Sequence, residues 1–150
     1  MAKPTIQKVF AYVTSGQRLL VFEHPDSPEA GIQVPAGTLE TGETIAEGVM
    51  REAYEETGLS DLILGVFLGE QVCDMSDYGK HEIHRRHFYH VICAGDVPDH
   101  WQHLEKFHSG GSPRETPFDL YWVYLPDGVP ELIADHGVMV GALLTALKLV

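Results

Sequence analysis

Acidic side chains recur at helical spacing in the segment GTLETGETIAEGVMREAYEETGL, which runs from Gly37 to Leu59. On a helix, Glu52, Glu55 and Glu56 share one side because they are spaced i, i+3 and i+4, and Arg51 lies next to them. Three converging carboxylates form a hard-oxygen site suited to Mg²⁺ or Mn²⁺. The alternative is a solvated surface on which Arg51 pairs with Glu47 and Glu55, at about 0.2–0.5 kcal/mol per pair. By itself the helix favours that solvated surface, since charge runs on helices are common.

The helix carrying these acids is predicted to run from about Thr44 to Thr57. Thr44 and Glu47 fit a capping box at its start, and Gly58 occupies the position of a terminating glycine. At about 100° per residue, the apolar side chains fall on one side and Glu56 lies at the edge of that stripe. An unpaired carboxylate buried there would be costly. The apolar side comprises Ile45, Ala46, Val49, Met50 and Ala53.

The rest of the chain reads as strands followed by a final helix. Residues 6–13 and 18–24 form a predicted hairpin around the turn TSGQ, because both are rich in β-branched and aromatic residues. Further strands are predicted at 31–34, 62–72, 87–95 and 118–125, with a long loop at 96–117 and a helix over 131–150. This order predicts an α/β (α+β) fold, a mixed sheet with helices packed on it.

Composition limits the class of protein. With 150 residues, 44% of them hydrophobic, the chain is expected to form a single domain over 1–150. A net charge of −12, from 22 acids and 10 bases, argues against non-specific nucleic-acid binding. It would also repel an anionic substrate unless divalent cations came with it.

We expect a cytoplasmic protein. The N-terminal residues turn polar too soon for a signal peptide. The most apolar run, residues 137–150 with Lys148 inside it, falls short of the ~20 residues that cross a bilayer. The two cysteines form no disulfide framework.

Spacing over the wider segment changes the interpretation of the acidic helix. Five residues separate Gly37 from Glu43, seven separate Glu43 from Arg51, and the run Arg51 to Leu59 reads REAYEETGL. This resembles the Nudix box, GX5EX7REUXEEXGU with U aliphatic, and every specified position is filled. Ala53 is a small but acceptable residue at one U position. The resemblance implies a Nudix-type α/β/α sandwich in which the box forms a loop, a helix and a loop.

The resemblance also implies roles for individual residues. Glu52, Glu55 and Glu56, with the backbone carbonyl of Gly37, would hold Mg²⁺ or Mn²⁺, while Glu43 and Arg51 would tie the loop to the helix. The implied reaction is metal-assisted hydrolysis of the pyrophosphate linkage of a nucleoside diphosphate joined to another moiety, X. The general base is left open between a box glutamate and a loop glutamate, for which Glu115 and Glu105 are candidates.

The substrate is less defined by sequence. Pro35, Ala36 and Gly37 resemble the corresponding triplet of ADP-ribose and ADP-sugar pyrophosphatases, which favours ADP-ribose or a nucleotide sugar. However, the proline that those enzymes carry about 16 residues after the box is missing. Tyr78 lies near, but out of register with, the tyrosine of dinucleoside polyphosphate hydrolases. Dinucleoside polyphosphates and (d)NTPs therefore stay open, as do a catalytically silent nucleotide-binding module and a homodimer.

Positive and titratable groups are concentrated in KHEIHRRHFYH, from Lys80 to His90. Arg85 and Arg86, with His84 or His87, would grip substrate phosphates, since arginine offers a bidentate fork. An exposed strand entry that pairs with surface acids is an equally good interpretation.

Overall fold

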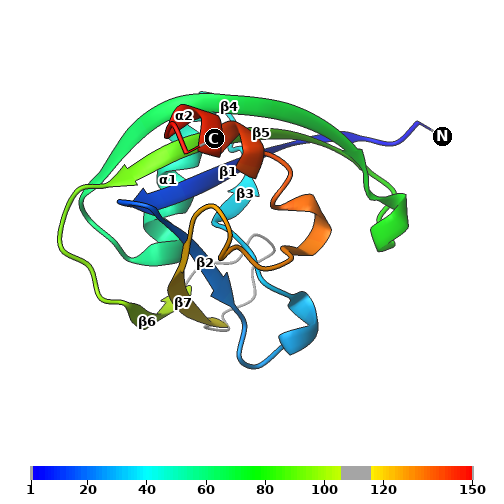
Figure 1. Ribbon diagram of the computed structural model, residues 1–150. Coiled ribbons are helices and arrows are strands. Elements are labelled where there is room, and N and C mark those ends of the chain that lie inside the picture. Colours follow the sequence, from blue (N-terminus) through cyan, green and yellow to red (C-terminus); the bar gives the residue numbers. More distant parts are fainter. Residues whose placement is uncertain (1, 106–115, 150) are drawn as a thin grey trace.

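A mixed seven-stranded sheet forms the middle layer of the computed structural model, which describes residues 2–105 and 116–149 (Figure 1). The strands run in the order β4-β5-β1-β2-β7-β6, and β3 pairs with β1. Only the β1–β5 pair is parallel. The strands are β1 (Thr5–Ser15), β2 (Arg18–Glu23), β3 (Ala36–Thr38), β4 (Leu62–Asp74), β5 (Ile83–Cys93), β6 (His100–Glu105) and β7 (Thr116–Tyr124). The helices are α1 (Ile45–Thr57) and α2 (Val140–Ala146), with 3₁₀ turns η1 (Pro28–Ala30), η2 (Met75–Tyr78) and η3 (Ile133–Asp135).

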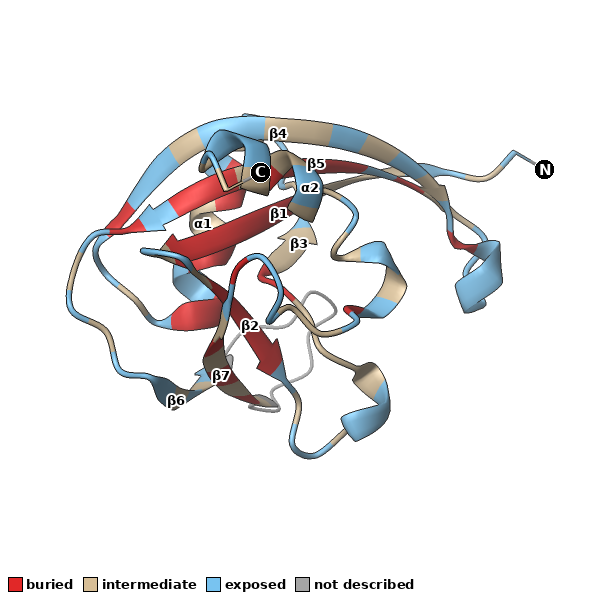
Figure 2. Cartoon of the chain, in the orientation of Figure 1, coloured by how far each residue is buried: buried red, intermediate tan, exposed pale blue. Residues whose placement is uncertain are grey.

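The two faces of the sheet bury two separate cores, because successive strand side chains point to opposite faces. Val9, Ala11 and Val13 of β1 pack in one cluster with Val49 and Ala53 of α1. The intervening residues of β1, Phe10 and Tyr12, pack in the other cluster with Leu143 of α2. Figure 2 shows the buried strands lying between the two helices. The predicted α/β/α sandwich around a mixed sheet is confirmed.

Strand β3 lies beside the middle of β1 because β2 leaves that edge early. β1 pairs with β2 only at Thr14–Leu19 and Ser15–Arg18. The edge of β1 from Lys8 to Phe10 then pairs with the three residues of β3. The start of the acidic segment is thereby fixed against the centre of the sheet.

Two strand predictions need correction. Residues 31–34 form no strand: Gln33 makes an isolated bridge to Phe22, and β3 begins only after Pro35. The predicted loop over 96–117 contains β6, which pairs with β7 from His100–Tyr121 to Glu105–Thr116. This part of the sequence is rich in glycine, proline and histidine, so its local propensity does not predict a strand. β6 forms because it pairs with β7, and strand formation depends strongly on such context.

The predicted helix over 131–150 is also wrong in its first half. Only Val140–Ala146 is helical, and Ala134 and Asp135 adopt positive φ angles of 47° and 61° in the preceding η3 segment. Tertiary hydrogen bonds hold this segment, since Ile133 N–H donates to Ile32 and Tyr12 Oη–H donates to the His136 carbonyl. Within the described residues, no helix has the length and apolar character needed to cross a membrane.

Candidate active site

Helix α1 presents the acidic side chains, and both of its ends are fixed by local hydrogen bonds. The Thr44 hydroxyl accepts from Glu47 N–H at 3.1 Å, and Glu47 Oε1 accepts from Thr44 N–H at 2.9 Å. Gly58 ends the helix with φ of 72°, in the left-handed region that glycine adopts without strain. The predicted capping box and terminating glycine are both present.

Of the three predicted metal-binding acids of α1, two are buried and one is exposed. Glu52 and Glu56 are only 8% and 7% exposed, beside the Val49 and Ala53 face that packs on the sheet. Glu55 is exposed to solvent. Burying two carboxylates costs free energy unless hydrogen bonds and charges compensate, so the neighbours of Glu52 and Glu56 define the site.

Glu56 is held by the backbone of β3. Its Oε1 accepts a hydrogen bond of 2.6 Å from Ala36 N–H. Leu39 N–H donates to Gln7, and Ala11 N–H donates to Pro35. Hydrogen-bonded pairs alternate along an antiparallel ladder. The backbone N–H and C=O of Gly37 therefore face β1, whereas those of Ala36 and Thr38 point away from β1. The outer edge of β3 thus faces the carboxylates of α1.

Gly37 makes room for Glu52. A Cβ added at Gly37 would lie 2.1 Å from Glu52 Cδ and 2.1 Å from its Oε1, far inside van der Waals contact. The requirement is close approach, because the φ angle of Gly37 is not positive. The glycine that opens the box therefore allows a buried carboxylate to lie against the sheet.

Arg51 joins the loop to the helix through several charge-assisted hydrogen bonds. It grips Glu43 with Nε at 2.6 Å and Nη2 at 3.0 Å, a bidentate arrangement. Its Nη1 donates to Glu52 at 2.7 Å and to Glu55 at 3.3 Å, and its Nη2 donates to the Thr38 carbonyl at 3.0 Å. The hydrogen bond from Arg51 lowers the pKa of Glu43, while Glu43 raises that of Arg51.

The three predicted metal ligands of this helix differ in their surroundings, and their role as ligands stays a prediction. No three His, Cys, Asp or Glu side chains in ranges 2–105 and 116–149 gather closely enough to enclose a metal ion. Glu55 is drawn toward Arg51, so the buried pair is Glu52 and Glu56. The donor chemistry still fits a hard divalent cation, because Glu52 and Glu56 are both carboxylates at the outer edge of β3. The space that the Glu52 carboxylate occupies there would be filled by a Cβ if Gly37 were any other residue.

Lys8 is a neighbour of this site that the sequence reasoning missed. Its Nζ donates to Thr38 Oγ1 at 2.9 Å. Burial lowers the Lys8 pKa most strongly and Lys80 adds to that lowering, whereas the nearby charges of Glu52 and Glu56 oppose it. A lysine in the middle of an otherwise apolar strand was the available signal, but only the pairing of β1 with β3 shows where it lies.

The predicted phosphate-binding arginines lie elsewhere. Arg86 is 2% exposed and does not face solvent, and its predicted role in phosphate binding stays a prediction. It donates to the Ala134 carbonyl at 2.5 Å and lies over the Phe10 ring at 5.3 Å, so it is engaged in holding η3 against the sheet. Arg85 is exposed and pairs with Glu70 at 3.4 Å.

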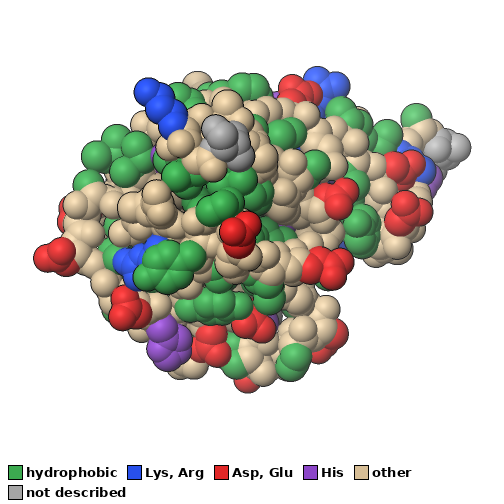
Figure 3. All heavy atoms as spheres, in the orientation of Figure 1, with side chains coloured by type: hydrophobic (Ala, Val, Ile, Leu, Met, Phe, Trp, Pro, Cys, Tyr) green, Lys and Arg blue, Asp and Glu red, His purple; other side chains and the backbone are tan. Residues whose placement is uncertain are grey.

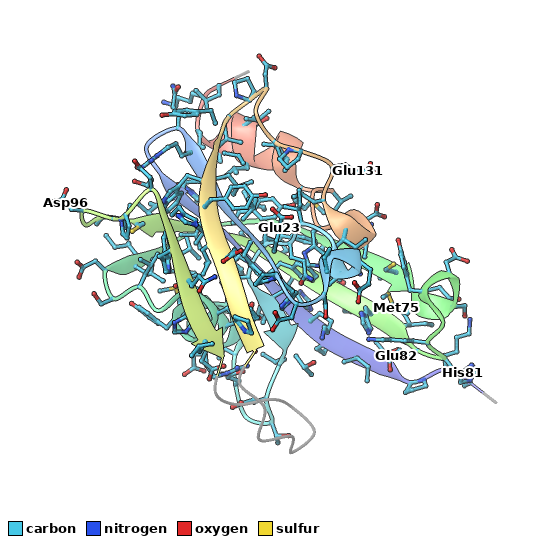
Figure 4. All side chains as sticks on the ribbon, turned by 90° about the horizontal axis from the view of Figure 1, so that it is seen from below. Glu23, Met75, His81, Glu82, Asp96 and Glu131 are labelled. Atoms are coloured by element: carbon cyan, nitrogen blue, oxygen red, sulfur yellow. The ribbon has the colours of Figure 1, made fainter. Side chains whose placement is uncertain are left out.

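The remaining candidates from the sequence are dispersed. Tyr78 is exposed on η2, in the lobe marked by Met75 and Glu82 in Figure 4. His84 and His87 bind Glu82 and Gln7 at 2.7 and 2.8 Å. Glu115 lies outside the described residues, and Glu105 is the last residue of β6, with a side chain that is also outside the description.

Strand β6 supports the C-terminal turn of α1. Trp101 Nε1–H donates to the Thr57 carbonyl at 2.8 Å, and His103 Nε2 lies 2.7 Å from the Glu55 carbonyl. The last carbonyls of a helix have no partner within the helix, so outside donors satisfy them. This support was missed because its strand was predicted as loop.

Comparison with known families and structures agrees with this geometry. The NUDIX domain model matches residues 4–130, and the chain belongs to that family. It is an enzyme of the Nudix pyrophosphohydrolase class, as the box predicted. Among curated proteins, none matches the chain.

Solved structures of Nudix proteins share the fold. A NUDIX hydrolase from Nitrosomonas europaea is 28% identical, with TM-score 0.53, over 65% of this chain and 64% of its own. A UDP-X diphosphatase is 16% identical, with TM-score 0.64, over 99% and 64%. A bifunctional NMN adenylyltransferase/ADP ribose pyrophosphatase from Francisella tularensis, complexed with AMP and a Mn ion, is 22% identical, with TM-score 0.56, over 97% and 42%. The chain thus spans less than two thirds of each of these relatives.

Proposed function

We propose that this enzyme hydrolyses the pyrophosphate linkage of a nucleoside diphosphate joined to another moiety, X. The proposed substrate is ADP-ribose or a nucleotide sugar, and the proposed cofactor is Mg²⁺ or Mn²⁺. The observation that carries the proposal is the buried pair Glu52 and Glu56, held against the outer edge of β3. Glu52, Glu56 and a backbone carbonyl of that edge would hold the metal, and Glu55 would join them from the helix surface. We place the carbonyl at Ala36 rather than at Gly37, because the ladder directs Gly37 toward β1.

Bound divalent cations would neutralise the pyrophosphate oxygens and make a bound water more acidic. The chain's own residues prepare for this. Arg51 orients Glu52 through a 2.7 Å hydrogen bond, and Ala36 N–H orients Glu56. Both carboxylates are thereby fixed before a ligand arrives, which reduces the free energy spent on ordering them. Water then adds across the P–O–P bond to give two phosphate monoesters.

The general base stays a proposal between Glu55 or another box glutamate and the loop glutamates Glu105 and Glu115. Glu105 pairs with Thr116 across the β6–β7 ladder, and Glu115 lies outside the described residues. Changing each to Gln separately tests them: the base is the glutamate whose loss lowers kcat and removes the acidic limb of its pH profile.

Substrate choice is supported by Pro35-Ala36-Gly37 and by the activities of two proteins of similar fold, a UDP-X diphosphatase and a bifunctional NMN adenylyltransferase/ADP ribose pyrophosphatase. Hydrolysis of dinucleoside polyphosphates or (d)NTPs is the second candidate. A catalytically silent nucleotide-binding module is disfavoured because all specified positions of the box are filled.

Hydrolysis of a panel of ADP-ribose, sugar nucleotides, dinucleoside polyphosphates and nucleoside triphosphates, with Mg²⁺ or Mn²⁺, tests the function. Chromatography of the nucleotide products measures it, because cleavage of the proposed substrates yields phosphate monoesters and no free phosphate. Glu56→Gln should lower kcat/KM by on the order of 100-fold or more, since it removes a charged metal ligand. Glu29→Gln, an exposed acid on η1, is the control and should retain wild-type rates. An inactive wild type, or a fully active Glu56→Gln, would contradict the proposal.

We further propose a cytoplasmic homodimer that forms through β4. This strand is an edge of the sheet, and Ile63, Val66 and Phe67 are 53%, 55% and 51% exposed along a run without charges from Leu62 to Gly69. An uncharged edge strand is prone to pair with another strand. Two copies of β4 would pair antiparallel about a two-fold axis. Molar mass by light scattering tests it: Val66→Lys should give monomers, and a monomeric wild type would exclude the dimer.

A further inference from the structure

The acidic chain has few cations to offer an anionic substrate. Its 10 lysines and arginines face 22 acids. A pyrophosphate ester carries negative charge that the carboxylates of α1 repel. A basic side chain near the carboxylate pair would therefore be expected to contact the phosphates.

Most described basic side chains are already engaged or distant from that pair. Arg51 is bound to several acids, and Arg86 is enclosed against η3 and Phe10. Exposed Lys80 and Lys148 lie after η2 and after α2. Three others form ion pairs: Lys3 with Asp74 at 2.6 Å, Arg18 with Asp99 at 3.1 Å, and Arg85 with Glu70 at 3.4 Å.

Lys8 differs from all of these. It is half-buried, and its ammonium donates to a neutral hydroxyl, Thr38 Oγ1. An ammonium has three N–H donors, so the hydrogen bond to Thr38 leaves two for another acceptor.

The position of Lys8 is fixed by pairing on both sides. Its register partners are Thr38 on β3 and Arg86 on β5. Thr38 directly follows Gly37, against which the Glu52 carboxylate rests. The charges of Glu52 and Glu56 reach Lys8 and oppose the loss of its proton. The Lys8 side chain leaves the sheet on the face opposite α1, the face of Phe10 and Arg86, and it reaches the edge of β3 near enough for the charges of Glu52 and Glu56 to act on it.

We propose that Lys8 is a substrate-binding residue whose ammonium donates to a non-bridging phosphate oxygen of the nucleoside diphosphate. The inference rests on the proposed function and adds a protein contact to it. The competing role is purely internal: Lys8 would only offset the negative charge of Glu52 and Glu56. The two roles make opposite statements about nucleotide binding in the presence of metal. Removing a charge that only offsets the carboxylates strengthens their attraction for a cation and would leave ADP binding unchanged or tighter, whereas removing a phosphate donor weakens it.

Binding of ADP in the presence of Mg²⁺, measured by calorimetry, tests Lys8→Met against Lys148→Met, which makes the same change in net charge at an exposed site. Lys8→Met should weaken ADP binding roughly 10- to 100-fold, the typical value of a hydrogen bond to a charged group. It should raise KM for the best substrate of the panel by a similar factor. Its Mn²⁺ affinity without nucleotide should be unchanged or higher, and Lys148→Met should match the wild type throughout.

Three outcomes would overturn the inference: ADP binding equal to that of Lys148→Met, weaker Mn²⁺ binding without nucleotide, or full affinity in Lys8→Gln. Lys8→Gln keeps a donor for Thr38 and lacks the charge, so it replaces Lys8→Met if circular dichroism shows that the latter does not fold. A failed proposed function would give a different result. Wild type would then hydrolyse no member of the panel, while the Lys8 dependence of ADP binding would still be measurable.

Discussion

Gly37 shows how one missing methyl group shapes the carboxylate pair. Gly37→Ala would place a Cβ at 2.1 Å from Glu52 Cδ, so the carboxylate or β3 must move. We expect a loss of unfolding free energy of about 1–3 kcal/mol, as for other overpacked sites. We also expect a drop in kcat/KM larger than this loss would cause, because Glu52 is displaced. Urea denaturation and steady-state kinetics measure the two effects.

Gly141→Ala is the matched control. Gly141 lies in α2, and a Cβ there meets no atom within 4 Å. Alanine should stabilise the helix by up to about 1 kcal/mol and leave kinetics unchanged. Equal behaviour of the two variants would contradict the tight contact between Gly37 and Glu52.

His136 is a buried histidine that makes stability depend on pH. Its Nδ1 accepts from Val34 N–H at 3.2 Å, and its ring meets the edge of Phe10. Burial, with smaller contributions from Arg86 and Lys8, lowers its pKa from 6.5 to about 3. The unfolded chain therefore binds the proton first, so the stabilising contribution is complete above about pH 6.5 and is lost as pH falls toward about 3.

Between about pH 7.5 and about pH 5, His136 should account for about 2 kcal/mol of lost unfolding free energy. Asparagine can still accept a hydrogen bond and does not titrate, so His136→Asn should flatten the pH dependence by that amount. Urea denaturation of both proteins at the two pH values measures it. The other histidines are common to both proteins and cancel in the difference; parallel pH profiles would refute the assignment.

At the scale of elements, β6 and α1 form one unit. Trp101 donates to the Thr57 carbonyl at the end of the helix that bears Glu55 and Glu56. Trp101→Phe should cost about 1–3 kcal/mol of unfolding free energy, because it leaves a carbonyl of a fully buried residue without that donor. It should also weaken Mn²⁺ binding, since the last turn of the helix is less well fixed.

Trp122→Phe is the control that separates the loss of stability expected for Trp101→Phe from its weaker Mn²⁺ binding. Trp122 donates to the Pro98 carbonyl at 2.9 Å and belongs to the same hydrophobic cluster, but its hydrogen bond does not reach α1. We expect a comparable loss of stability with unchanged Mn²⁺ affinity in calorimetric titrations. If both variants bind Mn²⁺ as the wild type does, β6 has no part in positioning the carboxylates.

At the scale of the whole molecule, the charge of −12 links stability to cations. Figure 3 shows acidic side chains spread over the face that it presents, with fewer basic ones between them. Salt should raise Tm by screening this repulsion. Mg²⁺ should raise it further than NaCl of equal ionic strength, by roughly 2–4 °C per kcal/mol of binding free energy.

Glu52→Gln with Glu56→Gln should abolish the extra effect of Mg²⁺ and retain that of NaCl. Thermal unfolding followed by circular dichroism measures both. A Mg²⁺ effect that survives in the double variant would mean that the stabilising cations bind elsewhere on the acidic surface.

Local chemistry explains which parts could be predicted from sequence. The capping box of Thr44 and Glu47, the stop at Gly58 and the first hairpin depend on residues close together in the chain, and all are present in the structure. β6 and the end of the chain could not be predicted this way. β6 exists through pairing with β7, and the η3 segment is held by Ile32, Tyr12 and Arg86, which are distant in sequence.

The sequence by itself determined the class of the enzyme, because the residues of the box are spaced along one loop and one helix whose geometry is local. Tertiary structure decided which of them are buried and what surrounds them. Pairing of β3 with β1 places Gly37 and Lys8 beside Glu52 and Glu56, and the same sheet encloses Arg86 instead of exposing it. Burial and charge environment arise from contacts between distant segments, so spacing along the chain does not contain them.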